Sequence, residues 1–144
     1  MRKILLGCLI TWTLFIFYQG TRSSSVSIQS SDKIVHQVVD VVEKVTPQSE
    51  NELYQIVHFF VRKSAHLFEY TVLGGLLVAY FNKDLIHSLF GVLLCATLDE
   101  YLQSFVGRTS SVEDILIDFG GGFVGIIIIS ILLREIKNRL NSPY

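Results

Sequence analysis

The sequence predicts an all-α, polytopic membrane protein: a four-transmembrane-helix bundle with a short amphipathic extracytoplasmic helical segment between its first and second helices. Half of the 144 residues are hydrophobic and only 17% are charged, whereas soluble domains carry about 25% charged residues. The apolar residues gather in blocks that approach the ~20 helical residues needed to cross a hydrocarbon core of ~30 Å. A net charge of −1 argues against a nucleic-acid partner. We expect one membrane domain that covers residues 1–144.

Four blocks are expected to span the bilayer: residues 4–20, 64–81, 85–104 and 114–133. The first block follows two basic residues and lacks a small-x-small cleavage site, so we expect a retained helix rather than a removed signal peptide. The second block is interrupted only by His66 and Glu69, and the third includes an acidic end.

The outer segment, residues 21–63, contains two expected helices. Pro47 separates them, and Ser49 with Glu52 forms a capping box for the second helix, which leads into the second span. In the first, apolar side chains recur on one helical face, which predicts an amphipathic helix on the membrane surface or the bundle mouth. The residues of this stripe are Ile34, Val38, Val41, Val42 and Val45.

Lysine and arginine residues indicate the orientation. They are roughly threefold denser in residues 1–3, 82–84 and 134–144 than in the remaining connections, and cytoplasmic segments are enriched in these cations. We therefore expect a multi-pass protein of the cell membrane with both termini in the cytoplasm.

Polar side chains are concentrated at one end of three expected spans. They occupy the start of the second span, the end of the third and the start of the fourth. Because these spans alternate in direction, the three groups meet on one side of the membrane, the extracytoplasmic side. Ionisable groups at membrane depth are functional candidates by default. The expected ligand-binding residues are Lys63, His66, Glu69, Tyr70, Asp99, Glu100, Gln103, Arg108, Asp114 and Asp118. Arg62, in contrast, is assigned to the headgroup region.

The helix dipole acts differently on the two pairs of acidic residues. Asp114 and Asp118 lie near a helix N-terminus, where the dipole favours an anion by ~0.3–1 kcal/mol. Their stripe continues through glycines to Gly125, and small residues allow a neighbouring helix to approach closely. Asp99 and Glu100 lie near a helix C-terminus, where the dipole opposes them, so they require cations, a proton or a metal ion.

Three segments resemble, in order, the motifs of the VanZ-like family of small bacterial membrane proteins. Residues 62–74 (RKSAHLFEYTVLG) resemble its RKxxHxxEYxxLG segment. Residues 99–108 (DEYLQSFVGR) resemble the segment that begins DExxQxF and ends in GR, although Val106 stands where a proline is frequent. Residues 114–125 resemble the closing Dxxx(N/D)xxGxxxG stretch, with Asp118 where asparagine is frequent. The resemblance implies a multi-helix protein of the cell envelope and a link to teicoplanin resistance, and it supplies no reaction.

Three functions are consistent with these residues. The first is binding of an anionic or glycosylated cell-envelope ligand, with a consequence for glycopeptide (teicoplanin) susceptibility. Lys63 and Arg108 would hold a phosphate or carboxylate. Another is that of a structural partner of another membrane protein, in which the charges form internal ion pairs. The expected partners are the lipid bilayer and a lipid-linked or glycopeptide-related envelope ligand.

The remaining function is that of a membrane-embedded acid/base or metal-assisted enzyme that acts on a lipid-linked envelope substrate. Its candidate catalytic residues are His66, Glu69, Asp99 and Glu100, and its metal version would gather a cation at Asp99, Glu100 and Asp114. No recognised metal spacing such as HExxH occurs. We therefore assign neither a metal site nor a cofactor from the sequence, and we leave catalysis open.

Overall fold

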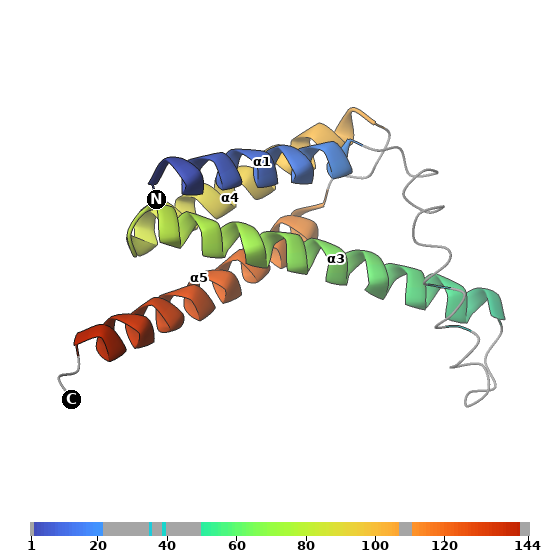
Figure 1. The fold of residues 1–144 in the computed structure, drawn as a ribbon. Coiled ribbons are helices and arrows are strands. Elements are labelled where there is room, and N and C mark those ends of the chain that lie inside the picture. Colours follow the sequence, from blue (N-terminus) through green and yellow to red (C-terminus); the bar gives the residue numbers. More distant parts are fainter. Residues whose placement is uncertain (1, 22–34, 36–38, 40–49, 107–110, 142–144) are drawn as a thin grey trace.

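The computed structural model describes residues 2–21, 35, 39, 50–106 and 111–141, and this part of the chain is almost entirely helical. The four helices, labelled as in Figure 1, are α1 (Arg2–Gly20), α3 (Glu50–Tyr80), α4 (Leu85–Ser104) and α5 (Val112–Asn141). Helix α3 contacts each of the other three helices, and α5 crosses it (Figure 1). The expected all-α bundle is therefore present.

Three of the four helices in the described part are long and apolar enough to cross a membrane, namely α1, α4 and α5. The expectation of four spans is wrong by this measure, since α3 does not qualify. Its centre carries Arg62, Lys63, His66 and Glu69, which lower its hydropathy. Because α3 packs against all three neighbours, much of its surface meets protein rather than lipid.

Helix α3 is one continuous helix of 31 residues, about 46 Å long at ~1.5 Å per residue. The sequence divides this stretch into an outer helix and a span that begins at residue 64. No proline interrupts residues 50–80, so the two segments join into one rod. Helix α5 likewise continues past residue 133 to Asn141.

The predicted apolar stripe of the outer segment lies outside the described residues. Two other residues of that segment, Val35 and Val39, are described, helical and buried. They pack in a small apolar cluster with Leu53 and Val57 of α3. Val35 and Val39 therefore cover the part of α3 that contains Leu53 and Val57.

Glycine residues bring the backbones of α3 and α5 together. A Cβ atom added at Gly125 would overlap the carbonyl oxygen of Thr71, and one added at Gly121 would lie 2.6 Å from that of Leu67. The Thr71 hydroxyl lies 3.1 Å from the Gly121 carbonyl oxygen, to which it donates. The expected glycine stripe on α5 thus serves close helix packing.

A tight turn joins α3 to α4. Asn82 and Lys83 have φ values of 53° and 72°, and the Lys83 N–H donates to the Val78 carbonyl at 2.9 Å, as in a Schellman motif. Asp84 then caps α4, because its carboxylate accepts the His87 backbone N–H at 3.1 Å. These hydrogen bonds reverse the chain and return α4 alongside α3.

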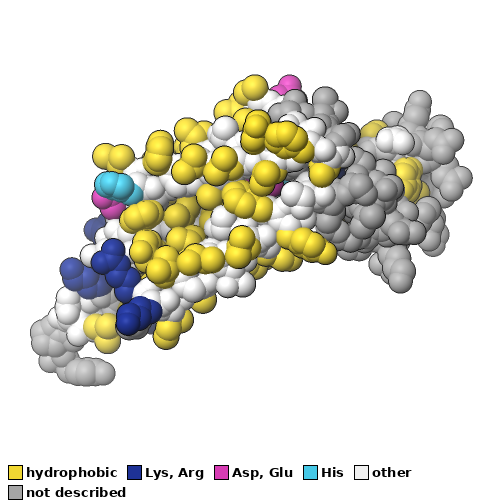
Figure 2. Space-filling view, turned by 90° about the horizontal axis from the view of Figure 1, so that it is seen from above, with side chains coloured by type: hydrophobic (Ala, Val, Ile, Leu, Met, Phe, Trp, Pro, Cys, Tyr) yellow, Lys and Arg dark blue, Asp and Glu magenta, His cyan; other side chains and the backbone are white. Residues whose placement is uncertain are grey.

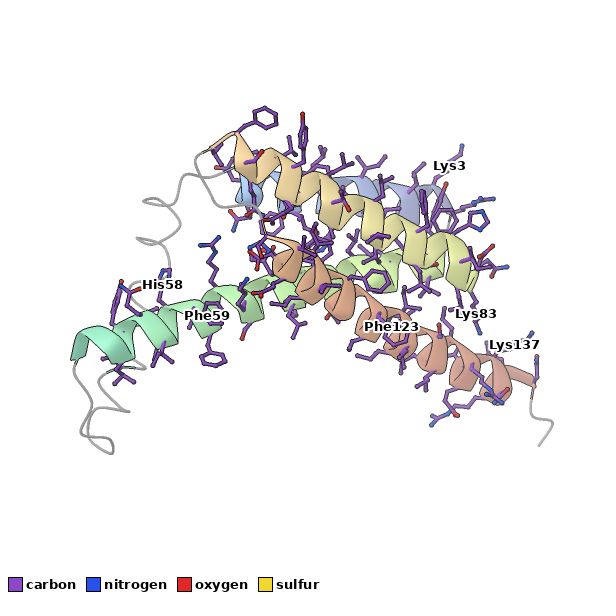
Figure 3. All side chains as sticks on the ribbon, turned by 180° about the vertical axis from the view of Figure 1, so that it is seen from behind. Lys3, His58, Phe59, Lys83, Phe123 and Lys137 are labelled. Carbon is purple, nitrogen blue, oxygen red and sulfur yellow. The ribbon has the colours of Figure 1, made fainter. Side chains whose placement is uncertain are left out.

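The surface and the ends of the bundle differ in character. On the face that Figure 2 shows, apolar side chains spread along the described helices, and lysine and arginine gather at one end. Lys3, Lys83 and Lys137 lie together at that end, whereas His58 lies at the other (Figure 3). The beginning of α1, the α3–α4 turn and the end of α5 therefore share one side of the bundle.

Candidate polar site

Side chains from α3, α4 and α5 enclose a small cavity at the end of the bundle opposite Lys83. This polar cavity measures about 10 Å³, about the space that one water molecule or one ion needs. Its lining residues are Arg62, Lys63, His66, Glu100, Gln103, Asp114, Ile117 and Asp118. The end of α4 and the start of α5 thus meet the middle of α3, as the alternation of the helices predicts.

Two pairs connect α3 to α5. Lys63 Nζ forms an ion pair with Asp114 Oδ1, and His66 Nδ1 lies 3.8 Å from Asp118 Oδ1. Asp114 is partly exposed, whereas the Asp118 side chain is only 3% exposed. Lys63 also places its Nζ over the ring of Phe59, 5.4 Å from the centroid.

The acidic end of α4 is buried. Asp99, Glu100 and Gln103 have exposed fractions of 0%, 2% and 2%. Gln103 Nε2 donates to Asp99 Oδ2 at 2.9 Å. A Cβ atom added at Gly20, the last residue of α1, would overlap Asp99 Oδ1, so α1 closes the site from the fourth side.

Ser111 fixes the start of α5 against the end of α4. Its backbone N–H donates to Glu100 Oε1 at 2.7 Å, and its carbonyl accepts the N–H groups of Asp114 and Ile115. Ser111 is not among the predicted site residues, because a backbone donor leaves no signature in residue types.

Three predicted residues lie beside the cavity rather than in its lining, namely Asp99, Glu69 and Tyr70. Tyr70 is fully buried in the apolar core, and its hydroxyl makes no hydrogen bond within the described residues. Glu69 is partly buried, and its backbone carbonyl accepts the Trp12 indole N–H at 2.9 Å.

The predictions for Arg62 and Arg108 have different outcomes. Arg108 lies outside the described residues, so its predicted role in ligand binding stays a prediction. Arg62 lines the cavity, although the prediction from the sequence was a position in the lipid headgroup region. Its position next to Lys63 is the sequence signal that pointed to the site.

The comparison with protein families gives one result: the VanZ/LLP1 family model matches residues 4–133. The chain belongs to the VanZ/LLP1 family. The three apolar helices and this membership of VanZ/LLP1 identify it as a membrane protein. No curated protein and no solved structure matches the chain, so the VanZ/LLP1 match supplies the family and no reaction.

Proposed function

We propose that this VanZ/LLP1 protein binds the anionic head group of a lipid or lipid-linked precursor of the cell envelope at the rim of the polar cavity, where the partly exposed Arg62 and Lys63 lie. The observation that carries the proposal is the pair of adjacent cations, Arg62 and Lys63, in a lining that is otherwise acidic or neutral apart from His66. An arginine can hold a phosphate or carboxylate through two parallel hydrogen bonds, and a lysine adds a point charge.

The surroundings of these cations favour an amphiphilic ligand. Phe59, Phe60 and Phe68 of α3 expose 54%, 62% and 63% of their surface. Aromatic and apolar side chains of this kind face lipid in membrane proteins. A ligand with a charged head group and an apolar tail would satisfy both the cavity and this face.

The distribution of lysine residues supports an extracytoplasmic location for the cavity. Lys3, Lys83 and Lys137 share the opposite end of the bundle (Figure 3), and cations concentrate on the cytoplasmic side. We therefore place both termini in the cytoplasm and the polar cavity at the outer face, with the bilayer as its surroundings. Binding an envelope precursor there would change what a glycopeptide meets, and we extend the proposal to teicoplanin susceptibility.

The experiment measures binding of a fluorescent polyprenyl phosphate to the full chain in nanodiscs, with the matching uncharged polyprenol as the reference ligand. Hydrogen bonds to charged groups contribute about 1.5–3 kcal/mol, so Arg62→Gln and Lys63→Gln should each weaken binding about 10- to 100-fold. Lys83→Gln, which removes a lysine at the opposite end, should leave binding unchanged.

Equal affinity for phosphate and alcohol, or full binding by Lys63→Gln, would refute the head-group proposal. The same incubation, resolved by thin-layer chromatography, separates binding from catalysis. Recovery of the phosphate intact supports binding, whereas its conversion would favour the enzymatic alternative, whose candidate catalytic residues are His66, Glu69, Asp99 and Glu100.

A further inference from the structure

Three helices each contribute one metal-ligating side chain to the inner part of the polar site. These side chains are His66 of α3, Asp99 of α4 and Asp118 of α5. One ligand atom from each lies within 4.8 Å of the others. Donor atoms about 2.1 Å from a shared ion lie at most ~4.2 Å apart, so small side-chain rotations would bring all three into coordination.

Glu100 gives a second and independent indication of a ligand. This residue is 2% exposed and lines the polar cavity together with His66 and Asp118. Its Oε1 accepts the Ser111 N–H, whereas its buried Oε2 has no hydrogen-bond partner within the described residues. A buried carboxylate oxygen without a donor is costly, and a cation in the cavity would satisfy it.

The local charge also favours a cation. Asp99, Glu100 and Asp118 are all nearly fully buried, whereas Arg62 and Lys63, the two cations of the cavity lining, are partly exposed. Burying an ionised carboxylate costs several kcal/mol unless an opposite charge compensates it. A single divalent ion offsets two of the three negative charges, and the cavity of about 10 Å³ has room for one ion.

We propose that His66, Asp99 and Asp118 bind a divalent transition-metal ion, next to Glu100, which lines the polar cavity together with His66 and Asp118. An imidazole suits zinc, and carboxylates suit manganese, so Zn²⁺ and Mn²⁺ are the ions that best fit this donor set. The Gln103 amide, which donates to Asp99 Oδ2, is the kind of outer hydrogen bond that orients a metal ligand.

This site differs from the set Asp99, Glu100 and Asp114 that the sequence suggested for a metal-assisted enzyme. Asp114 pairs with Lys63, and His66 and Asp118 take part instead. The inference is separate from the proposed head-group binding, because it concerns the carboxylates and His66 rather than Arg62 and Lys63.

The experiment treats the full chain in detergent with chelator, removes the chelator, and titrates Mn²⁺ or Zn²⁺ alone without lipid. Metal bound after gel filtration is then measured by mass spectrometry. The wild type should retain about one equivalent per chain, and Asp118→Asn and His66→Gln should each weaken the affinity at least about 10-fold. Asp84→Asn is the matched control, since Asp84 and His87 form an exposed carboxylate–imidazole pair at the other end.

Circular dichroism and gel filtration establish that each variant is folded. X-ray absorption of the Zn²⁺-loaded wild type provides a readout that needs no variant, and it should show one imidazole nitrogen among oxygen ligands. A wild type that retains no metal, variants that bind as well as the wild type, or a shell without imidazole would each overturn the proposal. Because lipid is absent throughout, these outcomes leave the head-group experiment independent.

Discussion

Replacement of Gly125 by alanine tests whether the contact between α3 and α5 holds the polar site together. The added Cβ would overlap the Thr71 carbonyl oxygen and lie 3.0 Å from the Gly75 backbone nitrogen. Both obstacles are backbone atoms inside a helix, so they cannot move aside as the tip of a flexible side chain would. The two helices must separate instead.

The magnitude follows from a matched substitution in the same helix. Gly120 has no atom within 4 Å of an added Cβ, so Gly120→Ala gains the usual ~0.8–1 kcal/mol of helix propensity at no steric cost. Gly125→Ala gains the same propensity and adds an overpacking cost of about 1–3 kcal/mol. The two variants should therefore differ by about 1–3 kcal/mol in the free energy of unfolding.

The assay unfolds the purified chain in detergent by titration with a denaturing surfactant. Circular dichroism monitors the loss of helix during the titration. Asp118 lies two helical turns before Gly125 on the same face of α5, so Gly125→Ala should also widen the 3.8 Å approach of His66 to Asp118 and weaken Mn²⁺ binding. Equal stability of Gly125→Ala and Gly120→Ala would refute the argument that backbone contact positions this site.

Two further predictions concern the α3–α4 turn and the orientation. The backbone N–H and the ring of His87 hydrogen-bond to Asp84 and lower the pKa of its carboxyl. The stabilisation from this cap is present above the ordinary aspartate pKa and is lost as the pH falls through the lowered pKa. Asp84→Ala should therefore lower the melting temperature near pH 7, and the gap to the wild type should close as the pH falls below the ordinary aspartate pKa of about 3.9; a gap that stays constant would contradict the assigned cap. For orientation, exposed Gln55→Cys should react with a membrane-impermeant maleimide on intact cells, in a background without Cys8 and Cys95, and Lys83→Cys should react only after permeabilisation. The reverse pattern would place the polar cavity in the cytoplasm.

The amino-acid sequence by itself determined the helical class, the family motifs and the end of the bundle at which the polar groups meet. Successive spans alternate in direction. The start of the apolar half of α3, the end of α4 and the start of α5 must therefore lie on the same side of the membrane. Lys63, His66, Glu100, Gln103, Asp114 and Asp118 accordingly all line one cavity.

Only the tertiary structure decided which of these groups are partners. Hydropathy does not fix the rotation of a helix about its axis when lipid and protein interior are equally apolar. Here the glycine contacts between α3 and α5 set that rotation, which pairs His66 with Asp118 and leaves Tyr70 in the core. The sequence permits a continuous α3, since no proline interrupts residues 50–80. Only the tertiary structure shows that all three other helices pack against it.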